Sequence, residues 1–337
     1  MKTRFILDDG GWQYHHVVSR VVDRRIIFGE AEKRYFREWL GRYAEFCGIR
    51  VLTYCLMGNH FHILVGFSKG EAERFRQAAT DAEVLARAGA IYKPEFVEAL
   101  GRRIAEHRAE GDSAGADEIR NSLLSRMGDL SVFVQELKLR FSRWYNGRND
   151  RVGTLWEGRF RSVLVEGSRM ALETVAAYID LNPVRAKLAA DPKDYRFCGY
   201  GEAVGGGYGQ SVSARLGLAV VVDLEGEAAD GTKDWWSRVQ SRYRLLLFGR
   251  GARVGVVDLA AQQEVVRRGG ELSKVEALRC RVRYLTEGGA IGTKAFLEQV
   301  FATERRRGKF GEKRVTGARP MRGADWEGLA AIRDLQK

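Results

Sequence analysis

The sequence predicts an α+β fold, and three observations in the first 67 residues indicate it. The β-branched run Tyr14–Val22 is typical of a strand, and Glu30–Cys47 spaces its apolar residues three and four apart, as an amphipathic helix does. Val51–Leu56 and His60–Phe67 then predict two strands on either side of the turn residues Gly58-Asn59. The predicted order is therefore strand, helix, strand, strand.

Residues 68–130 change character and predict a helical insertion with mostly solvated faces. Alanine, glutamate and arginine dominate this stretch, and Glu71–Ala88 and Lys93–Glu110 have helical periodicity. The α+β pattern then resumes with elements that we expect to belong to the same unit, 1–200: a helix at Ser131–Asn146, a strand near Arg159–Val165 and a helix at Ser168–Leu181.

A glycine-rich stretch at 201–209 predicts a linker, and a basic, mainly helical C-terminal region is expected at 210–337. Helices are predicted near Trp235–Leu247, Leu272–Leu285 and Thr293–Arg307, followed by the basic stretch Arg305–Arg314. This region could add contacts to nucleic acid or keep the protein soluble.

The composition indicates a soluble protein with a polyanionic partner. The 337 residues carry a net charge of +12, and 45% of them are hydrophobic, enough for a sizeable core. No stretch approaches the ~20 apolar residues that span a bilayer, and the N-terminus lacks the apolar core of a signal peptide. Four dispersed cysteines without a CxxC pair argue against a disulfide framework or a zinc knuckle. We expect a cytoplasmic location and no membrane partner.

His60-Phe61-His62 is the first candidate site. Residues i and i+2 of a strand point to the same face, so both imidazoles are expected on one side and Phe61 in the core on the other. Two such nitrogens can hold one divalent ion. The alternative is two polar residues on a wet face of the sheet. Spacing alone does not favour the metal interpretation, but the chain has only five histidines and two of them lie here directly after the Gly58-Asn59 turn, which strengthens it.

Tyr178 and Asn182 form the second candidate site. At i and i+4 on a helix they share one face, and Pro183 is expected to end or kink the helix near Asn182. From the pattern alone, the simpler interpretation is favoured: an amphipathic helix with a half-buried tyrosine, whose C-terminus is served by the asparagine.

The third candidate is a segment that interleaves cations with aromatic residues. Cations contact phosphates and aromatic rings stack on bases, a combination typical of proteins that bind single-stranded nucleic acid. The alternative is a solvated helix with Phe141 and Trp144 in the core. The residues of this segment expected to contact DNA are Lys138, Arg140, Arg143, Arg148, Trp156, Arg159 and Arg161.

Three separated motifs, in order, resemble the REP-associated tyrosine transposases, which belong to the insertion-sequence-200-like branch of the HUH single-tyrosine nucleases. The motifs are Leu56–Leu64, Gly153–Ser162 and Tyr178–Ala186, and the strand Tyr14–Arg20 is also similar to the first strand of that family. The resemblance covers about residues 12–200; the insertion is longer than expected, and the chain after 205 lies outside it.

This resemblance implies a ferredoxin-like antiparallel sheet with helices, the core of an HUH nuclease. It implies Mg²⁺ or Mn²⁺ held by His60 and His62, with Asn182 matching the third ligand and Tyr178 matching the nucleophile. Tyr145 is the second choice of nucleophile. Arg20 and Arg185, which lie within the segments that resemble the family, join the residues expected to contact DNA.

The implied function is cleavage and rejoining of single-stranded, hairpin-forming repeat DNA through a 5′-phosphotyrosine intermediate. The residue types agree, because a tyrosine with an ordinary pKa of ~10 needs a nearby cation to attack a phosphate. No GxxxxGK[ST] loop is present, and we expect no small-molecule substrate. The protein is expected to be a monomer or a homodimer.

Two alternatives remain open at this stage. One is a domesticated relative that binds hairpin DNA without cutting it. The other is an RNA-binding protein on the same scaffold, which would expect aromatic residues where His60 and His62 stand. The complete set of two histidines, tyrosine and asparagine favours the enzyme.

Overall fold

The computed structural model describes residues 5–7, 10–205, 211–248, 273–310, 316–333 and 335. The chain begins with β1 (Trp12–Arg20), a short 3-10 turn (Val22–Arg24), α1 (Glu30–Cys47), β2 (Arg50–Leu56) and β3 (His60–Ser68). The predicted order of strand, helix, strand, strand is confirmed. Left-handed Gly48 ends α1, a conformation that suits glycine at a helix C-terminus.

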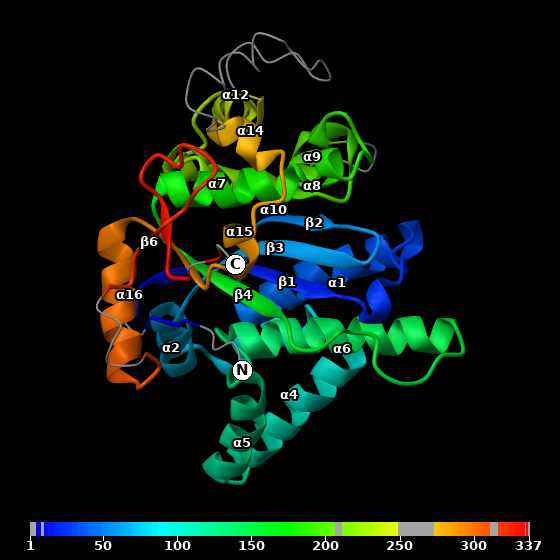
Figure 1. Ribbon diagram of the computed structural model, residues 1–337. Helices are drawn as coiled ribbons and strands as arrows, with labels where there is room; N and C mark the ends of the chain where they lie inside the picture. Colours follow the sequence, from blue (N-terminus) through cyan, green and yellow to red (C-terminus); the bar gives the residue numbers. More distant parts are fainter. Residues whose placement is uncertain are drawn as a thin grey trace.

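A seven-stranded mixed sheet is the centre of the molecule, with the order β2-β3-β1-β4-β5-β7-β6. Figure 1 shows β2, β3, β1 and β4 side by side. Strand β1 pairs antiparallel with both β3 and β4 (Arg161–Val165), and β2 pairs antiparallel with β3. The three further strands are β5 (Ala290–Gly292), β6 (Arg319–Pro320) and β7 (Ala330–Ala331), and β5 runs parallel to β4. Together with the helices this sheet makes the fold α+β, as predicted.

Helices cover both faces of the sheet. On one face α1 and α6 (Leu130–Arg148) bury Phe36 and Phe141 against Phe61 of β3. On the other face lies α7 (Arg169–Asp180), which continues into α8 (Asn182–Arg185). The apolar side of α7 packs against Leu64 and Val163 of the sheet. Figure 1 shows α7 and α10 (Val212–Val221) on the side of the sheet opposite α6.

The insertion consists of four helices: α2 (Lys69–Ala78), α3 (Asp81–Ala88), α4 (Pro94–Ala109) and α5 (Ser113–Leu124). The single helix expected over Glu71–Ala88 is wrong, because Thr80 begins a new helix with a reciprocal capping box to Glu83. Helices α4 and α5 project away from the sheet in Figure 1. Their exposed faces agree with the predicted solvation.

The prediction of a linker at 201–209 is wrong for its first part. Residues Gly199–Val204 form α9, which Gly205 ends in a left-handed conformation, and a side chain at Gly201 would clash with the Tyr195 carbonyl. The rest of the predicted linker, 206–209, lies outside the described residues. A short 3-10 turn, Pro192–Asp194, precedes α9.

The C-terminal region is mainly helical, as expected, but it also adds β5, β6 and β7 to the sheet. The single helix expected over Leu272–Leu285 is wrong for its described part, since α14 (Lys274–Leu278) and α15 (Tyr284–Glu287) replace it; residue 272 lies outside the described residues. Part of the basic stretch, 311–314, lies outside the described residues.

No helix in the described part of the chain is long and apolar enough to cross a membrane. The helices described in the C-terminal region are α10 (Val212–Val221), α11 (Glu225–Ala229), α12 (Trp235–Phe248), α14 (Lys274–Leu278), α15 (Tyr284–Glu287) and α16 (Lys294–Arg306).

Asp180, at the end of α7, ties four elements together. Its buried carboxylate accepts hydrogen bonds from the Thr53 hydroxyl of β2 (2.9 Å), the Tyr243 hydroxyl of α12 (2.6 Å) and the Tyr200 amide of α9 (3.1 Å). Burial raises the pKa of Asp180 to about 6, although these donors oppose the rise. The carboxylate therefore holds the C-terminal region against the sheet at an electrostatic cost.

This raised pKa predicts a pH dependence of stability. Between pH 4 and pH 6 the folded state holds a proton on Asp180 that the unfolded state has released. The contribution of Asp180 to the free energy of unfolding is thus full below pH 4 and falls as the pH rises through 6. The variant Asp180→Asn removes this titration, so its stability relative to the unmodified protein should rise by about 3 kcal/mol from pH 4 to pH 7.

Urea denaturation at several pH values measures this difference. Asp117→Asn is the control, because Asp117 is exposed and pairs only with Arg108 among the ion pairs of α5 and α4 described here. A difference that is constant with pH, or that falls as the pH rises, would contradict the role given to Asp180.

Candidate active site

A cavity of about 610 Å³ lies between the sheet, α7, α8 and the C-terminal region. His60 and His62 of β3 line it together with Tyr178 of α7 and Asn182 of α8. The structure therefore brings together all four residues that the sequence singled out for chemistry. Cations surround them, and these are Arg20, Arg159, Arg161, Arg185, Arg279 and Arg281.

The pleat of β3 positions the two histidines. Phe61 is fully buried among the side chains of α1 and α6, while His60 and His62 face the cavity from the opposite side of the sheet. Strand β1 pairs with β3 so that Val18 lies opposite His62 and Arg20 lies opposite His60. The predicted alternation along this strand is confirmed.

His16 of β1 is a site residue that the sequence analysis missed. Its Nε2 lies 2.9 Å from His62 Nδ1, and its Nδ1 lies 2.6 Å from the carbonyl oxygen of Leu285 in α15. Burial lowers the pKa of His16 to about 4 and that of His62 well below its usual value. Both imidazoles are therefore neutral at pH 7, the state in which a ring nitrogen can act as a ligand.

The pKa of His60 is also lowered to about 4, by burial first and then by Arg20 and Arg185. Its Nδ1 lies 2.6 Å from Asn59 Oδ1, and the Asn59 amide nitrogen donates to the Arg24 carbonyl at 2.9 Å. The turn that connects β2 and β3 thus orients the first histidine, as β1 orients the second.

Tyr178 lies beneath a guanidinium group. The Arg185 carbon Cζ is 4.0 Å from the centre of the Tyr178 ring, and the His16 and His62 rings meet it edge-on at 6.2 and 6.1 Å. Burial raises the pKa of Tyr178, while Arg185 and then Arg281 oppose this rise. The hydroxyl is therefore protonated at neutral pH, and the surrounding cations favour its anionic form.

Asn182 and Arg185 hold the end of α7. The Asn182 amide nitrogen donates to the carbonyls of Tyr178 (3.3 Å) and Ile179 (3.0 Å), and Arg185 donates to Tyr178 (2.7 Å) and to Leu278 of α14 (2.6 Å). The simpler interpretation of Asn182, service of the helix C-terminus, is therefore correct for its nitrogen. Its Oδ1 is the atom that it can offer to a cation. The expected interruption before Pro183 is confirmed.

The donor set fits a divalent metal ion. His60 and His62 offer neutral nitrogens and Asn182 offers an amide oxygen, and all three line the same cavity. Among the described residues, no group of three His, Cys, Asp or Glu side chains could hold a metal ion. A metal here would therefore have two imidazole ligands and depend on the amide for the third.

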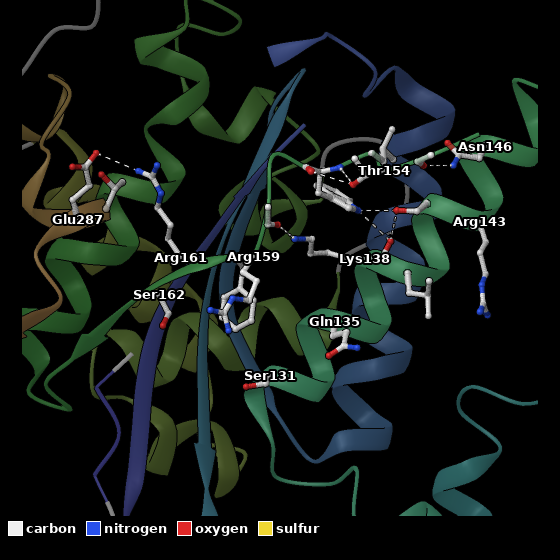
Figure 2. A pocket seen from close by; sticks show the side chains of 18 of the residues that line it. Ser131, Gln135, Lys138, Arg143, Asn146, Thr154, Arg159, Arg161, Ser162 and Glu287 are labelled. Carbon is white, nitrogen blue, oxygen red and sulfur yellow. Dashed lines mark hydrogen bonds and ion pairs between the residues drawn. The ribbon is translucent and has the colours of Figure 1, made fainter. Parts of the chain in front are cut away.

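A groove of about 1020 Å³ adjoins the cavity and shares Gly158, Arg159, Arg161, Thr286 and Glu287 with it. Figure 2 shows its two walls, with Lys138 and Arg143 on α6 and with Arg161 and Ser162 on β4. Uncharged polar side chains lie between these cations, including Ser131, Gln135 and Thr154. The groove is thus basic, with apolar side chains such as Leu139 and Phe160 also in its lining, and it adjoins the cavity that Tyr178 lines.

The residues expected to contact DNA form three groups: arginines that line the cavity or the groove, the exposed Arg148, and residues with partners within the protein. In the first group, Arg20 and Arg185 line the cavity, Arg143 lines the groove, and Arg159 and Arg161 line both. Arg161 is also paired with Glu287 of α15 at 3.4 Å. The exposed Arg148 lies at the end of α6, outside the linings of the cavity and the groove, with its guanidinium 5.8 Å from the Trp144 ring.

The third group has partners within the protein. Lys138 is buried and donates to the Gly158 carbonyl at 2.8 Å, and burial lowers its pKa to about 8. The Arg140 guanidinium lies 3.9 Å from the centre of the Trp39 ring, away from the groove. Trp156 is buried, and its indole nitrogen donates to Ser142 at 2.8 Å. Trp156 lines the groove but leaves little of its ring open to solvent, so its stacking on a base stays a prediction.

Tyr145, the second choice of nucleophile, lies elsewhere. Its ring stacks on Phe141 at 6.1 Å in the core formed by α1 and α6, and it lines neither the cavity nor the groove. The C-terminal region, in contrast, contributes Arg279, Arg281 and the carbonyl of Leu285 to the site. Motifs confined to residues 12–200 gave no indication of this contribution.

We predict that Arg281→Gln raises the pKa of Tyr178, because it removes an exposed cation that favours the phenolate. Titration of the protein labelled with ¹³Cζ-tyrosine measures this pKa by NMR. Arg283→Gln is the control, since Arg283 is also exposed but pairs with Glu287 and does not line the cavity. An equal or lower Tyr178 pKa in Arg281→Gln would contradict the electrostatic role of Arg281.

Comparisons with known proteins give no relative. No protein-family model, no curated protein and no solved structure matches this chain. The case for a function therefore depends on the geometry of the cavity and on the three sequence motifs.

Proposed function

We propose that the protein is a metal-dependent enzyme that cleaves and rejoins single-stranded DNA at hairpin-forming repeats through a 5′-phosphotyrosine intermediate. The observation that carries this proposal is the convergence of His60, His62, Tyr178 and Asn182 on one cavity surrounded by arginines. The two histidines of β3 lie more than 110 positions before Tyr178 of α7 and Asn182 of α8 in the chain. A tyrosine, two neutral imidazoles and a ring of cations suit attack on a phosphodiester.

The arrangement of the first four strands supports the resemblance to the HUH nucleases. Elements β1, α1, β2, β3, α6 and β4 follow the β-α-β-β-α-β order of ferredoxin-like folds when the insertion is set aside. Their strands lie in the order β2-β3-β1-β4 and all neighbours are antiparallel. Both crossing helices, α1 and α6, pack on the face of the sheet opposite the histidines.

The proposed reaction begins with the DNA strand in the groove and the scissile phosphate in the cavity. Tyr178 Oη releases its proton to water and attacks phosphorus in line with the 3′-oxygen of the preceding nucleotide. The bond from phosphorus to that oxygen breaks, the oxygen takes a proton from water, and the 5′-phosphate stays on Tyr178. Attack by a 3′-hydroxyl reverses these steps and joins two strands without an external energy source.

His60, His62 and Asn182 would hold Mg²⁺ or Mn²⁺, which supplies Lewis-acid polarisation of the scissile phosphate when it is bound. Arg185 lies over the Tyr178 ring and favours its anionic form, and Arg20 and Arg281 add positive charge to the same cavity. The exposed Arg143 and Arg159 would contact the phosphates that flank the cleavage point.

A second candidate function is recognition of hairpin DNA without cleavage. The burial of Tyr178 favours this alternative, since only 3% of the residue is exposed and its pKa is raised. A buried hydroxyl must still reach a phosphate in the cavity for the enzyme proposal to hold. The two functions differ in one product, the covalent link between protein and DNA.

We predict that the protein forms a covalent adduct with an end-labelled single-stranded hairpin from its own genomic flanks in the presence of Mn²⁺. The adduct appears as a protein-linked band on a denaturing gel. Tyr178→Phe keeps the ring but removes the attacking oxygen, so it should bind the hairpin and form no adduct.

Tyr145→Phe is the matched control and should retain the adduct, because Tyr145 lies outside the cavity. A band that survives Tyr178→Phe and disappears in Tyr145→Phe would transfer the nucleophile to Tyr145. Hairpin binding by the unmodified protein without any band would favour the recognition protein.

We also predict that Arg143→Ala weakens binding of single-stranded DNA and lowers the salt dependence of its affinity. Removal of one phosphate contact should reduce the slope of log K against log salt concentration by about 0.7. Arg140→Ala is the control, because Arg140 lies three positions away on α6 and stacks on Trp39 outside the groove. Fluorescence anisotropy at several salt concentrations measures both slopes, and equal slopes for the two variants would exclude the groove as the DNA path.

A further inference from the structure

We propose that His16 and Asn59 are positioning residues that fix His62 and His60 in the tautomer with hydrogen on Nδ1, so that both present the Nε2 lone pair to a metal ion. This inference rests on the proposed function for its purpose, but the tautomers themselves follow from hydrogen bonds in the structure. Neither His16 nor Asn59 lines the cavity.

The tautomer of His62 follows from a chain of two hydrogen bonds. A carbonyl oxygen only accepts, so the contact of 2.6 Å between His16 Nδ1 and Leu285 O requires a hydrogen on His16 Nδ1. The His16 ring is fully buried and has no carboxylate among its hydrogen-bond partners, so it is neutral and its Nε2 carries a lone pair. His62 Nδ1, 2.9 Å away, must then donate, and His62 Nε2 keeps the lone pair.

The tautomer of His60 follows from the orientation of Asn59. The Asn59 amide nitrogen donates to the Arg24 carbonyl at 2.9 Å, which turns its Oδ1 to the other side. An amide oxygen only accepts, so His60 Nδ1, 2.6 Å away, must donate, and the lone pair of His60 is also on Nε2. Asn59 belongs to the turn before β3, whereas His16 belongs to β1, so two separate elements produce the same result.

The hydrogen bonds to His16 and Asn59 matter because a neutral histidine in water prefers the other tautomer, with hydrogen on Nε2. Without its acceptor, each ring would have to move its hydrogen before Nε2 could bind a metal. Outer hydrogen-bond partners of this kind typically change metal affinity by about 10–100-fold. Asn182 is oriented in a similar way. Its amide nitrogen donates to two helix carbonyls, so its Oδ1 is the atom left to bind the ion.

Long-range ¹⁵N–¹H spectra of the metal-free protein test the tautomers directly. The five histidines of the chain can be assigned by single replacement. His60 and His62 should both carry hydrogen on Nδ1 in the unmodified protein. Hydrogen on Nε2 of either ring would overturn the assignment for that ring, whatever the activity of the protein.

Variants separate positioning from packing. His16→Phe keeps an aromatic ring but has no acceptor, so His62 should change to the Nε2–H tautomer and Mn²⁺ affinity, measured by calorimetry, should fall about 10–100-fold. His16→Gln retains an oxygen acceptor and should restore much of both. Asn59→Ala and Asn59→Asp form the corresponding pair for His60. The proposal would be overturned if His16→Phe and His16→Gln both bound Mn²⁺ as tightly as the unmodified protein and kept its histidine tautomers.

Failure of the inference and failure of the proposed function are distinguishable. Suppose that His60 and His62 carry hydrogen on Nδ1 and that the variants lose Mn²⁺ affinity, but that no hairpin gives a covalent adduct. The positioning role would then stand, and only the cleavage reaction would be removed. An adduct that forms with Nε2–H tautomers would do the reverse.

Discussion

The antiparallel pairing of β1 with β3 is the constraint on which the site depends. Its register places Val18 opposite His62 and Arg20 opposite His60, so that His16, His60 and His62 share one face of the sheet. Phe61 fills the core on the other face. A slip of one residue would send both histidines into the apolar core and Phe61 into the cavity. The burial of Phe36, Phe61 and Phe141 thus also specifies where the chemistry lies.

Burial produces both the strengths and the costs of this site. It keeps three imidazoles neutral, which a metal ligand requires, and it also raises the pKa of Tyr178, which opposes nucleophilic attack. Arg185 and Arg281 oppose the second effect, although the pKa of Tyr178 stays raised. Arg185 is fixed over the Tyr178 ring by two backbone carbonyls, one of them Leu278 of the C-terminal region. The C-terminal region is therefore part of the site, since it also supplies the Leu285 carbonyl that orients His16.

Local sequence patterns predicted the elements well and the long-range contacts poorly. The limits of α1 and the strands on either side of Gly58 followed from periodicity, and the strand period alone placed His60 and His62 on one face. His16 was missed because its contact with His62 depends on which strand pairs with β1. A histidine in a β-branched strand could have been noted as a third candidate.

The errors on α6 have a related cause. Helical periodicity tells which residues share a face, but not what covers that face, so the buried Lys138 resembled an exposed DNA contact. The loop that carries Trp156 and Gly158 folds back onto α6, where it covers Lys138 and buries its own Trp156. The role of Leu285 could not be predicted either, because a backbone carbonyl leaves no mark in the sequence.

The central proposal is that the cavity between β3 and α8 would hold a metal ion next to Tyr178, the proposed nucleophile. Anomalous diffraction at the manganese edge, from crystals grown with Mn²⁺, tests it most directly. The account predicts one strong peak bonded to His60 Nε2, His62 Nε2 and Asn182 Oδ1. A peak bonded to His62 Nδ1, a peak away from these three residues, or no peak at saturating Mn²⁺ would contradict it.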